Sequence, residues 1–230
     1  MRVLVVAAHP DDEVLGCGGT VARLASEGHD IFTLILGEGS TSRSQRREQA
    51  DTSLIDALHK SSLQAAKTLG TREVFKRNLP DNRFDSVPLL DIVKIVEELV
   101  AQLSPEVIYT HHGGDLNIDH SLTHRAVLTA TRPMKGQPVR EIYAFEVPSS
   151  TEWAFQRLEP VFRANVFEDI SATLDIKIEA LSNYETETRA FPHPRSPEAL
   201  RAIAQRWGSV VGGEAVEAFE LVRSVRLKNK

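Results

Sequence analysis

The chain has 230 residues, 41% of them hydrophobic and 26% charged, a composition typical of a folded globular domain and unlike a disordered or fibrous protein. Its 27 lysines and arginines against 32 aspartates and glutamates give a net charge of −5 with no extended basic run, which excludes a typical binder of nucleic-acid phosphates. No apolar stretch approaches the ~20 residues of a membrane span, and the single cysteine, Cys17, is typical of a reducing compartment, so we expect a cytoplasmic protein.

The predicted elements alternate between strands and helices. Residues 3–8 form a continuous apolar run rich in β-branched residues, which predicts a strand buried on both faces. Apolar residues then recur at helical spacing up to Gly28, and a second apolar run at 31–36 completes a strand–helix–strand unit. The same patterns predict further helices at 54–69, 89–103, 121–131, 174–181 and 198–207, and further strands at 74–75, 107–110 and 142–147. We therefore predict one α/β domain over residues 1–230, with a Rossmann-like, mostly parallel sheet flanked by helices.

Polar loops follow four of the predicted strands. They span residues 9–13, 37–43, 78–83 and 111–120, and they are rich in histidine and in carboxylates. Because ligands of open α/β sheets collect beyond the carboxyl ends of the strands, we expect these side chains to meet at one edge of the sheet.

The loop at 9–13 has the residue types of a catalytic metal site. Such a site commonly takes three histidine or carboxylate ligands and leaves a position open for water. With a single cysteine, a thiolate-rich site is excluded. Of the adjacent carboxylates Asp11 and Asp12, one could bind the metal and the other could act as general base. Alternatively, either aspartate could simply cap the helix that begins near Val14.

Three segments resemble the PIG-L/LmbE-like de-N-acetylases: Ala8-His9-Pro10-Asp11-Asp12-Glu13, Gly18-Gly19-Thr20 and Asp119-His120. The resemblance implies a Rossmann-like, zinc-dependent enzyme that hydrolyses the acetamide of N-acetylated sugars. It implies that His9, Asp12 and His120 bind the zinc and that Asp11 is the general base on the metal-bound water. Iron(II) would suit the same ligands, because mixed nitrogen and oxygen donors select weakly among these metals. Members of this family are often hexamers or other oligomers, so the resemblance also implies a homo-oligomer.

Residue 117 departs from the pattern of that family. The family has His-Pro-Asp-His, in which the aspartate tunes the first histidine, whereas this chain has Asn117-Ile118-Asp119-His120. Asn117 could donate a hydrogen bond to an oxyanion but could not protonate a leaving amine. The resemblance thus places Asn117 and Asp119 in the catalytic site and leaves the general acid open among Asp11, His111 and His124.

Four further residues are candidates for substrate binding, each with a structural alternative. Arg43 could contact sugar hydroxyls or phosphate, or belong to a serine-rich lid. Asp81 and Arg83 could bind substrate or form a turn. His193 lies in a proline-rich loop that could complete the pocket of a neighbouring subunit.

The leading functional hypothesis is removal of the acetyl group from an N-acetylated amino sugar or its conjugate, such as a nucleotide-sugar or surface-polysaccharide precursor. One alternative is an amidase for a thiol-sugar conjugate, and another is a non-catalytic Rossmann-like module that retains the metal. A dinucleotide ligand is not expected, because the loop after the first strand lacks Gly-x-Gly-x-x-Gly.

Overall fold

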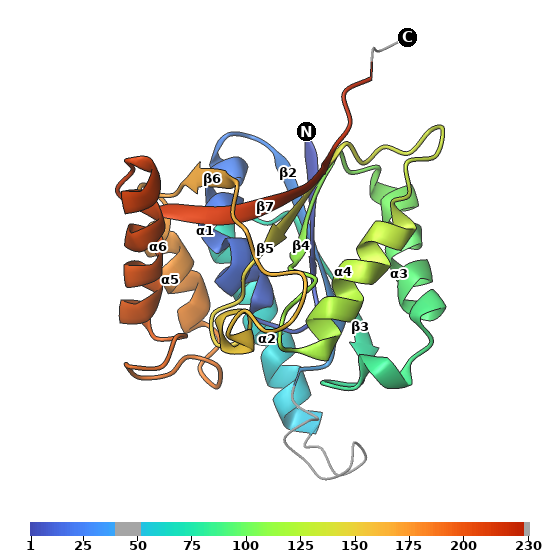
Figure 1. Cartoon of the computed structure of the whole chain (residues 1–230). Coiled ribbons are helices and arrows are strands. Elements are labelled where there is room, and N and C mark those ends of the chain that lie inside the picture. Colours follow the sequence, from blue (N-terminus) through green and yellow to red (C-terminus); the bar gives the residue numbers. More distant parts are fainter. Residues whose placement is uncertain (40–51, 228–230) are drawn as a thin grey trace.

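A computed structural model of the chain describes residues 1–39 and 52–227, and Figure 1 shows its arrangement of a central sheet between helical layers. The seven strands are ordered β3-β2-β1-β4-β5-β7-β6. Five of them run parallel to one another, whereas β7 is antiparallel to both β5 and β6. Their bounds are β1 Arg2–Ala7, β2 Asp30–Gly37, β3 Glu73–Leu79, β4 Val107–His111, β5 Glu141–Phe145, β6 Val166–Asp169 and β7 Val216–Ser224.

Helices cover both faces of the sheet. Within the described residues the α-helices are α1 Asp12–Ser26, α2 Thr52–Leu69, α3 Leu89–Leu103, α4 Ile118–Ala130, α5 Leu174–Ser182 and α6 Pro197–Val211, and two short 3₁₀ helices are η3 Phe84–Ser86 and η4 Glu152–Ala154. Helices α3 and α4 pack together on one face, and α1, α2 and α5 pack on the other (Figure 1). Strand β1 divides its side chains between the two cores, with Val3 and Val5 in one and Leu4 and Val6 in the other. The predicted α/β fold class is confirmed.

Strands β6 and β7 were not predicted. Strand β6 has only four residues, none of them fully buried. Strand β7 carries Glu217 and Glu220 among apolar residues, and its antiparallel pairing places it between β5 and β6. Such a strand depends on its tertiary partners rather than on its own pattern.

None of the helices in the described part of the chain is both long and apolar enough to cross a bilayer.

The start of α4 also differs from the prediction. The helix begins at Ile118 rather than at Ser121, because Asn117 caps it: the side-chain oxygen of Asn117 accepts a hydrogen bond from the N–H of Asp119. Asp119 and His120 are thereby held in the first helical turn, at the edge of the sheet where β4 ends.

Helix α1 is broken at Cys17, whose backbone is not helical (φ −148°, ψ 20°). The N–H groups of Gly19 and Thr20, which follow the break, donate to the two carboxylate oxygens of Glu217 at 3.0 and 2.7 Å. Lys177 Nζ donates to Glu217 at 2.6 Å and to the carbonyl of Leu15, ahead of the break, at 2.8 Å. The buried Lys177–Glu217 ion pair therefore provides hydrogen-bond partners for backbone groups on both sides of the break.

We expect Lys177→Ala to lower the free energy of unfolding by about 3–5 kcal/mol, because it leaves the Glu217 carboxylate buried without its cation. Urea denaturation measures this change. The surface pair Arg201–Asp175 is the matched control, since exposed pairs contribute about 0–1 kcal/mol, and Arg201→Ala should fall in that range. Equal losses in the two variants would contradict a structural role for the buried pair.

Candidate active site

The loop after β1 and the first turn of α4 bring three potential metal ligands together. His9 Nδ1, Asp12 Oδ2 and His120 Nε2 form a triangle in which each pair of atoms is 3.3 Å apart. Ligands at ~2.0–2.1 Å from a tetrahedral zinc ion lie about 3.3–3.4 Å from one another. The three donors are therefore arranged as one face of a zinc coordination tetrahedron, with the fourth position left for another ligand.

The other nitrogen of the His9 ring faces two further carboxylates. His9 Nε2 lies 2.9 Å from Asp119 Oδ2 and 3.3 Å from Asp81 Oδ1, so these three residues form a second group that could hold a cation. Burial acts to lower the pKa of His9, but hydrogen bonds with Asp119 and Asp12 raise it well above its usual value. A protonated Nε2 that donates to Asp119 leaves Nδ1 free to bind a metal, which is the usual role of a carboxylate behind a ligating histidine.

Asp119 is held from both sides. Its Oδ1 accepts the N–H of Phe84, 2.9 Å away, and its Oδ2 faces His9. In the family the corresponding aspartate tunes the first histidine of the motif, which is absent here, and in this chain the Asp119 carboxylate faces His9. Asn117 contacts Asp119 through the backbone N–H of Asp119, which donates to the side-chain oxygen of Asn117.

His120 has a comparable carboxylate behind it. Asp115 Oδ1 lies 3.1 Å from His120 Nδ1. Asp115 also accepts hydrogen bonds from the hydroxyls of Ser150 and Thr151 and, at 2.8 Å, from the N–H of Asn117. Burial acts to raise the pKa of Asp115, but its bonds with His120 and the two hydroxyls lower it to about 2. Asp115 was not predicted as a site residue, since its role depends on hydroxyls that lie 35 and 36 residues away along the chain.

Asp11 is fixed in the site by an arginine from the far end of the chain. Its backbone has a left-handed conformation (φ 101°), and its side chain makes no helix-capping hydrogen bond. Instead, Arg195 Nη1 donates to Asp11 Oδ2 at 2.7 Å, while Arg195 Nε donates to Ser149 Oγ at the same distance. Burial raises the pKa of Asp11, and Arg195 acts against this rise. The simple capping alternative does not apply to Asp12 either, because its carboxylate accepts the N–H of His9 at 2.8 Å.

Arg195 was not predicted as a site residue. Its signal in the sequence is the proline-rich run Pro192-His193-Pro194-Arg195, whose place in the fold no local pattern indicates. The structure places this loop beside Asp11, and Arg195 also lies 3.6 Å from Glu187. The nearby Tyr184 hydroxyl, also not predicted, donates to Glu13, which in turn accepts the N–H of Asp11.

The remaining predicted residues differ in their contacts with this centre. Asp81 is buried and faces His9, whereas the Arg83 side chain is exposed at the start of η3. His193 contacts the Trp153 ring edge-on, with ring centres 5.7 Å apart, and accepts the N–H of Arg195. Asn117 Nδ2 donates to Asn82 Oδ1 at 2.9 Å. Arg43 lies outside the described residues.

Two histidines considered as general acids have other partners. His111 Nε2 accepts the N–H of Ala8 at 2.8 Å, and its buried ring stacks on that of His120 with centres 4.0 Å apart. His124 Nδ1 donates to the backbone carbonyl of His111 at 2.8 Å. His111 therefore supports a potential ligand, and His124 binds backbone.

Two of the relatives to which this chain is similar have names that describe deacetylases. The Escherichia coli (strain K12) protein "Uncharacterized deacetylase YaiS" is 28% identical over 190 residues, which cover 80% of this chain and 90% of YaiS. The Bacillus cereus "Probable N-acetyl-alpha-D-glucosaminyl L-malate deacetylase 2" is 26% identical over 195 residues, covering 83% of this chain and 85% of the relative.

Among solved structures, 4-carboxy-2-hydroxymuconate hydratase GalB from Pseudomonas putida KT2440 matches with a TM-score of 0.75 at 22% identity, covering 100% of this chain and 99% of GalB. This likeness shows the fold alone. Residues 4–131 match the family described as "PIG-L: GlcNAc-PI de-N-acetylase". Because this match covers more than half of the chain and includes His9, Asp12 and His120, the chain belongs to the PIG-L family.

Proposed function

We propose that this protein is a zinc-dependent hydrolase that removes the acetyl group from an N-acetylated amino sugar. The observation that carries the proposal is the equilateral arrangement of His9 Nδ1, Asp12 Oδ2 and His120 Nε2 next to a buried carboxylate, Asp11, that is not part of the triangle. The family description and the name of the Bacillus cereus relative support the choice of an acetylated amino sugar as substrate, and the name of YaiS supports removal of an acetyl group.

A zinc ion held by the three donors would supply a Lewis acid for the acetamide carbonyl and lower the pKa of a water molecule. Asp11 is assigned the proton of that attacking water. Its Oδ2 is held by Arg195, so the second oxygen, Oδ1, is the atom assigned to receive the proton. The carbon–nitrogen bond of the acetamide then breaks, and the proton held by Asp11 passes to the leaving nitrogen, giving a free amine and acetic acid, which releases its proton to become acetate.

Asp119, Asp115 and Asn117 have supporting roles in the proposed site. Asp119 and Asp115 orient the rings of His9 and His120 from behind. The amide group of Asn117 has two N–H bonds, one of which is directed to Asn82. The second is the proposed donor to the carbonyl oxygen of the acetamide, which becomes negatively charged as water adds.

Acetate release tests the function directly. We expect the purified protein to release acetate from N-acetylglucosamine or a simple glycoside of it, to lose this activity after chelation, and to regain it with zinc. Reconstitution with iron(II) in the absence of oxygen compares the two candidate metals. Acetate release that persists in a metal-free sample, as verified by elemental analysis, would contradict the proposal.

A further inference from the structure

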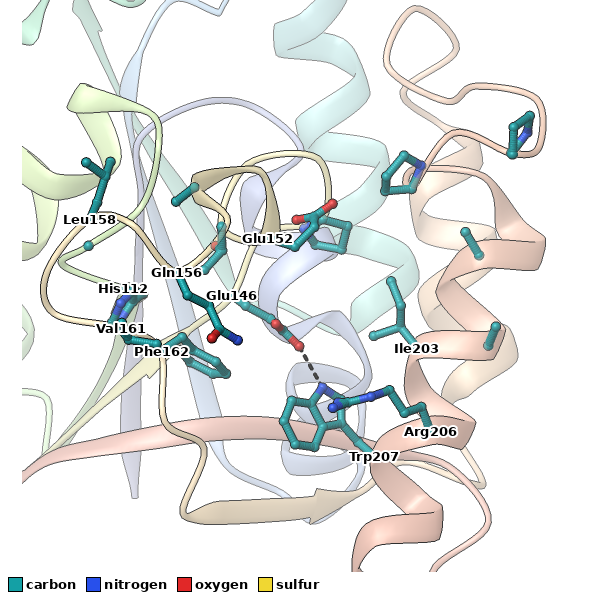
Figure 2. Close-up of a pocket in the computed structure, with 18 of the residues that line it drawn as sticks. His112, Glu146, Glu152, Gln156, Leu158, Val161, Phe162, Ile203, Arg206 and Trp207 are labelled. Atoms are coloured by element: carbon teal, nitrogen blue, oxygen red, sulfur yellow. Dashed lines mark hydrogen bonds between the residues drawn. The ribbon is translucent and has the colours of Figure 1, made fainter.

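A large cavity, with a volume of about 640 Å³, lies beside the proposed metal centre. Figure 2 shows its walls, which come from the segment after β5, the loop that follows η4, and helix α6. Thr151 lines the cavity and donates to Asp115, which faces His120, whereas none of the three proposed zinc ligands lines it. Because packed residues separate this cavity from the metal centre, a molecule bound here is a second ligand and not a part of the substrate.

The wall formed by the loop after η4 is fixed to the segment that follows β4. A Cβ atom at Gly114 would lie 1.8 Å from the carbonyl oxygen of Pro160, so only glycine allows this approach. The same carbonyl accepts a hydrogen bond from His112 Nε2 at 2.7 Å, and His112 Nδ1 lies 3.0 Å from Glu220 Oε2. These contacts hold the cavity open before any ligand arrives, as is usual for small-molecule sites.

The lining of the cavity is mainly apolar. Its aromatic and aliphatic members include Leu158, Phe162, Phe191, Ile203 and Trp207. Phe191 and Leu158 are 66% and 43% exposed, so the apolar lining continues to the surface, where a ligand enters. The volume and the lining suit an organic molecule with an apolar body.

Glu146 places a carboxylate within this apolar lining. Its Oε1 accepts the indole N–H of Trp207 at 2.6 Å, as the dashed line in Figure 2 shows. Among the described residues, the carboxylate has no other hydrogen bond and no ion pair, so Oε2 has no partner there. The buried carboxylate of Glu217, by contrast, is paired with Lys177.

The charges around Glu146 favour a cation. Burial raises the pKa of Glu146, and the carboxylate of Glu152, which also lines the cavity, adds to this effect. Arg206 lines the cavity as well, but its guanidinium lies over the Trp207 ring, 4.3 Å from the ring centre, and forms no ion pair with Glu146. A desolvated carboxylate is stabilised most by a positively charged hydrogen-bond donor.

We infer that this cavity is a binding site for an organic amine, a protonated alkylamine or arylalkylamine whose ammonium group donates to Glu146 Oε2. Its hydrocarbon part packs against apolar lining residues such as Phe162 and Ile203. A phosphorylated or carboxylated ligand is disfavoured, because it would meet the carboxylates of Glu146 and Glu152 among apolar walls. The inference goes beyond the proposed function and does not rest on it, since binding here requires no acetamide at the metal centre.

Calorimetric titration of the zinc-loaded protein with three probes tests the site: 4-phenylbutylamine, 4-phenylbutan-1-ol and propylamine. The alcohol has the apolar body without the charge, and propylamine has the charge with a smaller apolar body. We expect 4-phenylbutylamine to bind at least about tenfold more tightly than the alcohol, because hydrogen bonds between charged groups are the stronger ones. It should also bind at least about tenfold more tightly than propylamine, because each buried methylene strengthens binding about fourfold.

Glu146→Gln assigns the charge preference to one residue. The amide oxygen still accepts the indole N–H of Trp207, so the alcohol should bind the variant and the wild type alike, whereas the amine should bind no more tightly than the alcohol. Glu198→Gln is the matched control, since Glu198 is an exposed residue of α6 that does not line the cavity, and it should keep the full preference for the amine.

Three results would overturn the inference: none of the probes binds, the wild type binds the amine and the alcohol equally, or the preference for the amine persists in Glu146→Gln. Loss of the preference in Glu198→Gln would overturn it as well, because the charge read by the amine would then lie outside the cavity. Acetate release enters none of these measurements. A protein without deacetylase activity that binds the amine through Glu146 would refute the proposed function and leave this site standing.

Discussion

Replacing Asp11 with asparagine is expected to lower the turnover number at least about 10²-fold while the metal content stays near that of the wild type, because the amide cannot accept the proton of the attacking water. Asparagine keeps a side-chain oxygen for the hydrogen bond from Arg195, so the local packing should survive. Initial rates of acetate release and elemental analysis of the same samples measure both quantities.

Asp85→Asn is the matched control for this substitution. Asp85 is an exposed aspartate of η3, so its loss should leave turnover and metal content unchanged. If Asp11→Asn loses the metal and Asp12→Asn retains it, the two neighbouring aspartates have each other's roles.

The double variant His9→Ala, His120→Ala is expected to lose the bound metal entirely and, with it, detectable turnover. It removes two of the three donors of the triangle, and one remaining carboxylate cannot hold a zinc ion against the buffer. Elemental analysis after dialysis measures the loss, and circular dichroism checks that the fold persists. His124→Ala, one turn further along α4, removes a ring bonded to the carbonyl of His111 and should keep about one metal ion per chain.

The alternative cation group makes a further comparison informative. Asp81 belongs only to the group formed by His9, Asp81 and Asp119. Because Asp81 is not one of the three proposed zinc ligands, Asp81→Asn should retain the metal. If Asp81→Asn loses the metal and His120→Ala retains it, the ion is held by the second group.

Much of this site could be predicted because its residues lie in short loops after the strands of a parallel sheet. His9 and Asp12 follow β1, His120 follows β4, and these two strands are neighbours, so the topology alone brings the loops together. The continuous apolar run of β1 indicated a central strand, and its residues are indeed divided between two cores.

Other parts of the site depend on contacts that no local pattern reports. Arg195 lies 184 residues from Asp11, and only the packing of the loop before α6 brings them together. His124 was a candidate for the general acid, but its ring donates to the backbone carbonyl of His111. Likewise, Glu217 interrupts the apolar pattern of its strand. Its role becomes evident only from its contacts with Lys177 and with the backbone that follows the break in α1.

The walls of the cavity beside the site also depend on contacts between distant segments. Its walls join the β4–α4 loop, the segments on either side of η4, and α6, which lie far apart in the sequence. Trp207 illustrates the difference: its helix was predicted from the spacing of apolar residues, whereas the partner of its indole N–H, Glu146, is 61 residues away. The walls of this cavity therefore depend mainly on tertiary packing.

The most direct test of the proposed metal centre is the position of the metal in crystals grown with zinc, located by anomalous scattering at the zinc absorption edge. We predict one strong peak per chain at ~2.0–2.2 Å from His9 Nδ1, Asp12 Oδ2 and His120 Nε2, with Asp11 outside the coordination sphere. A peak among His9, Asp81 and Asp119, with Asp12 and His120 uncoordinated, would contradict the proposed ligand set.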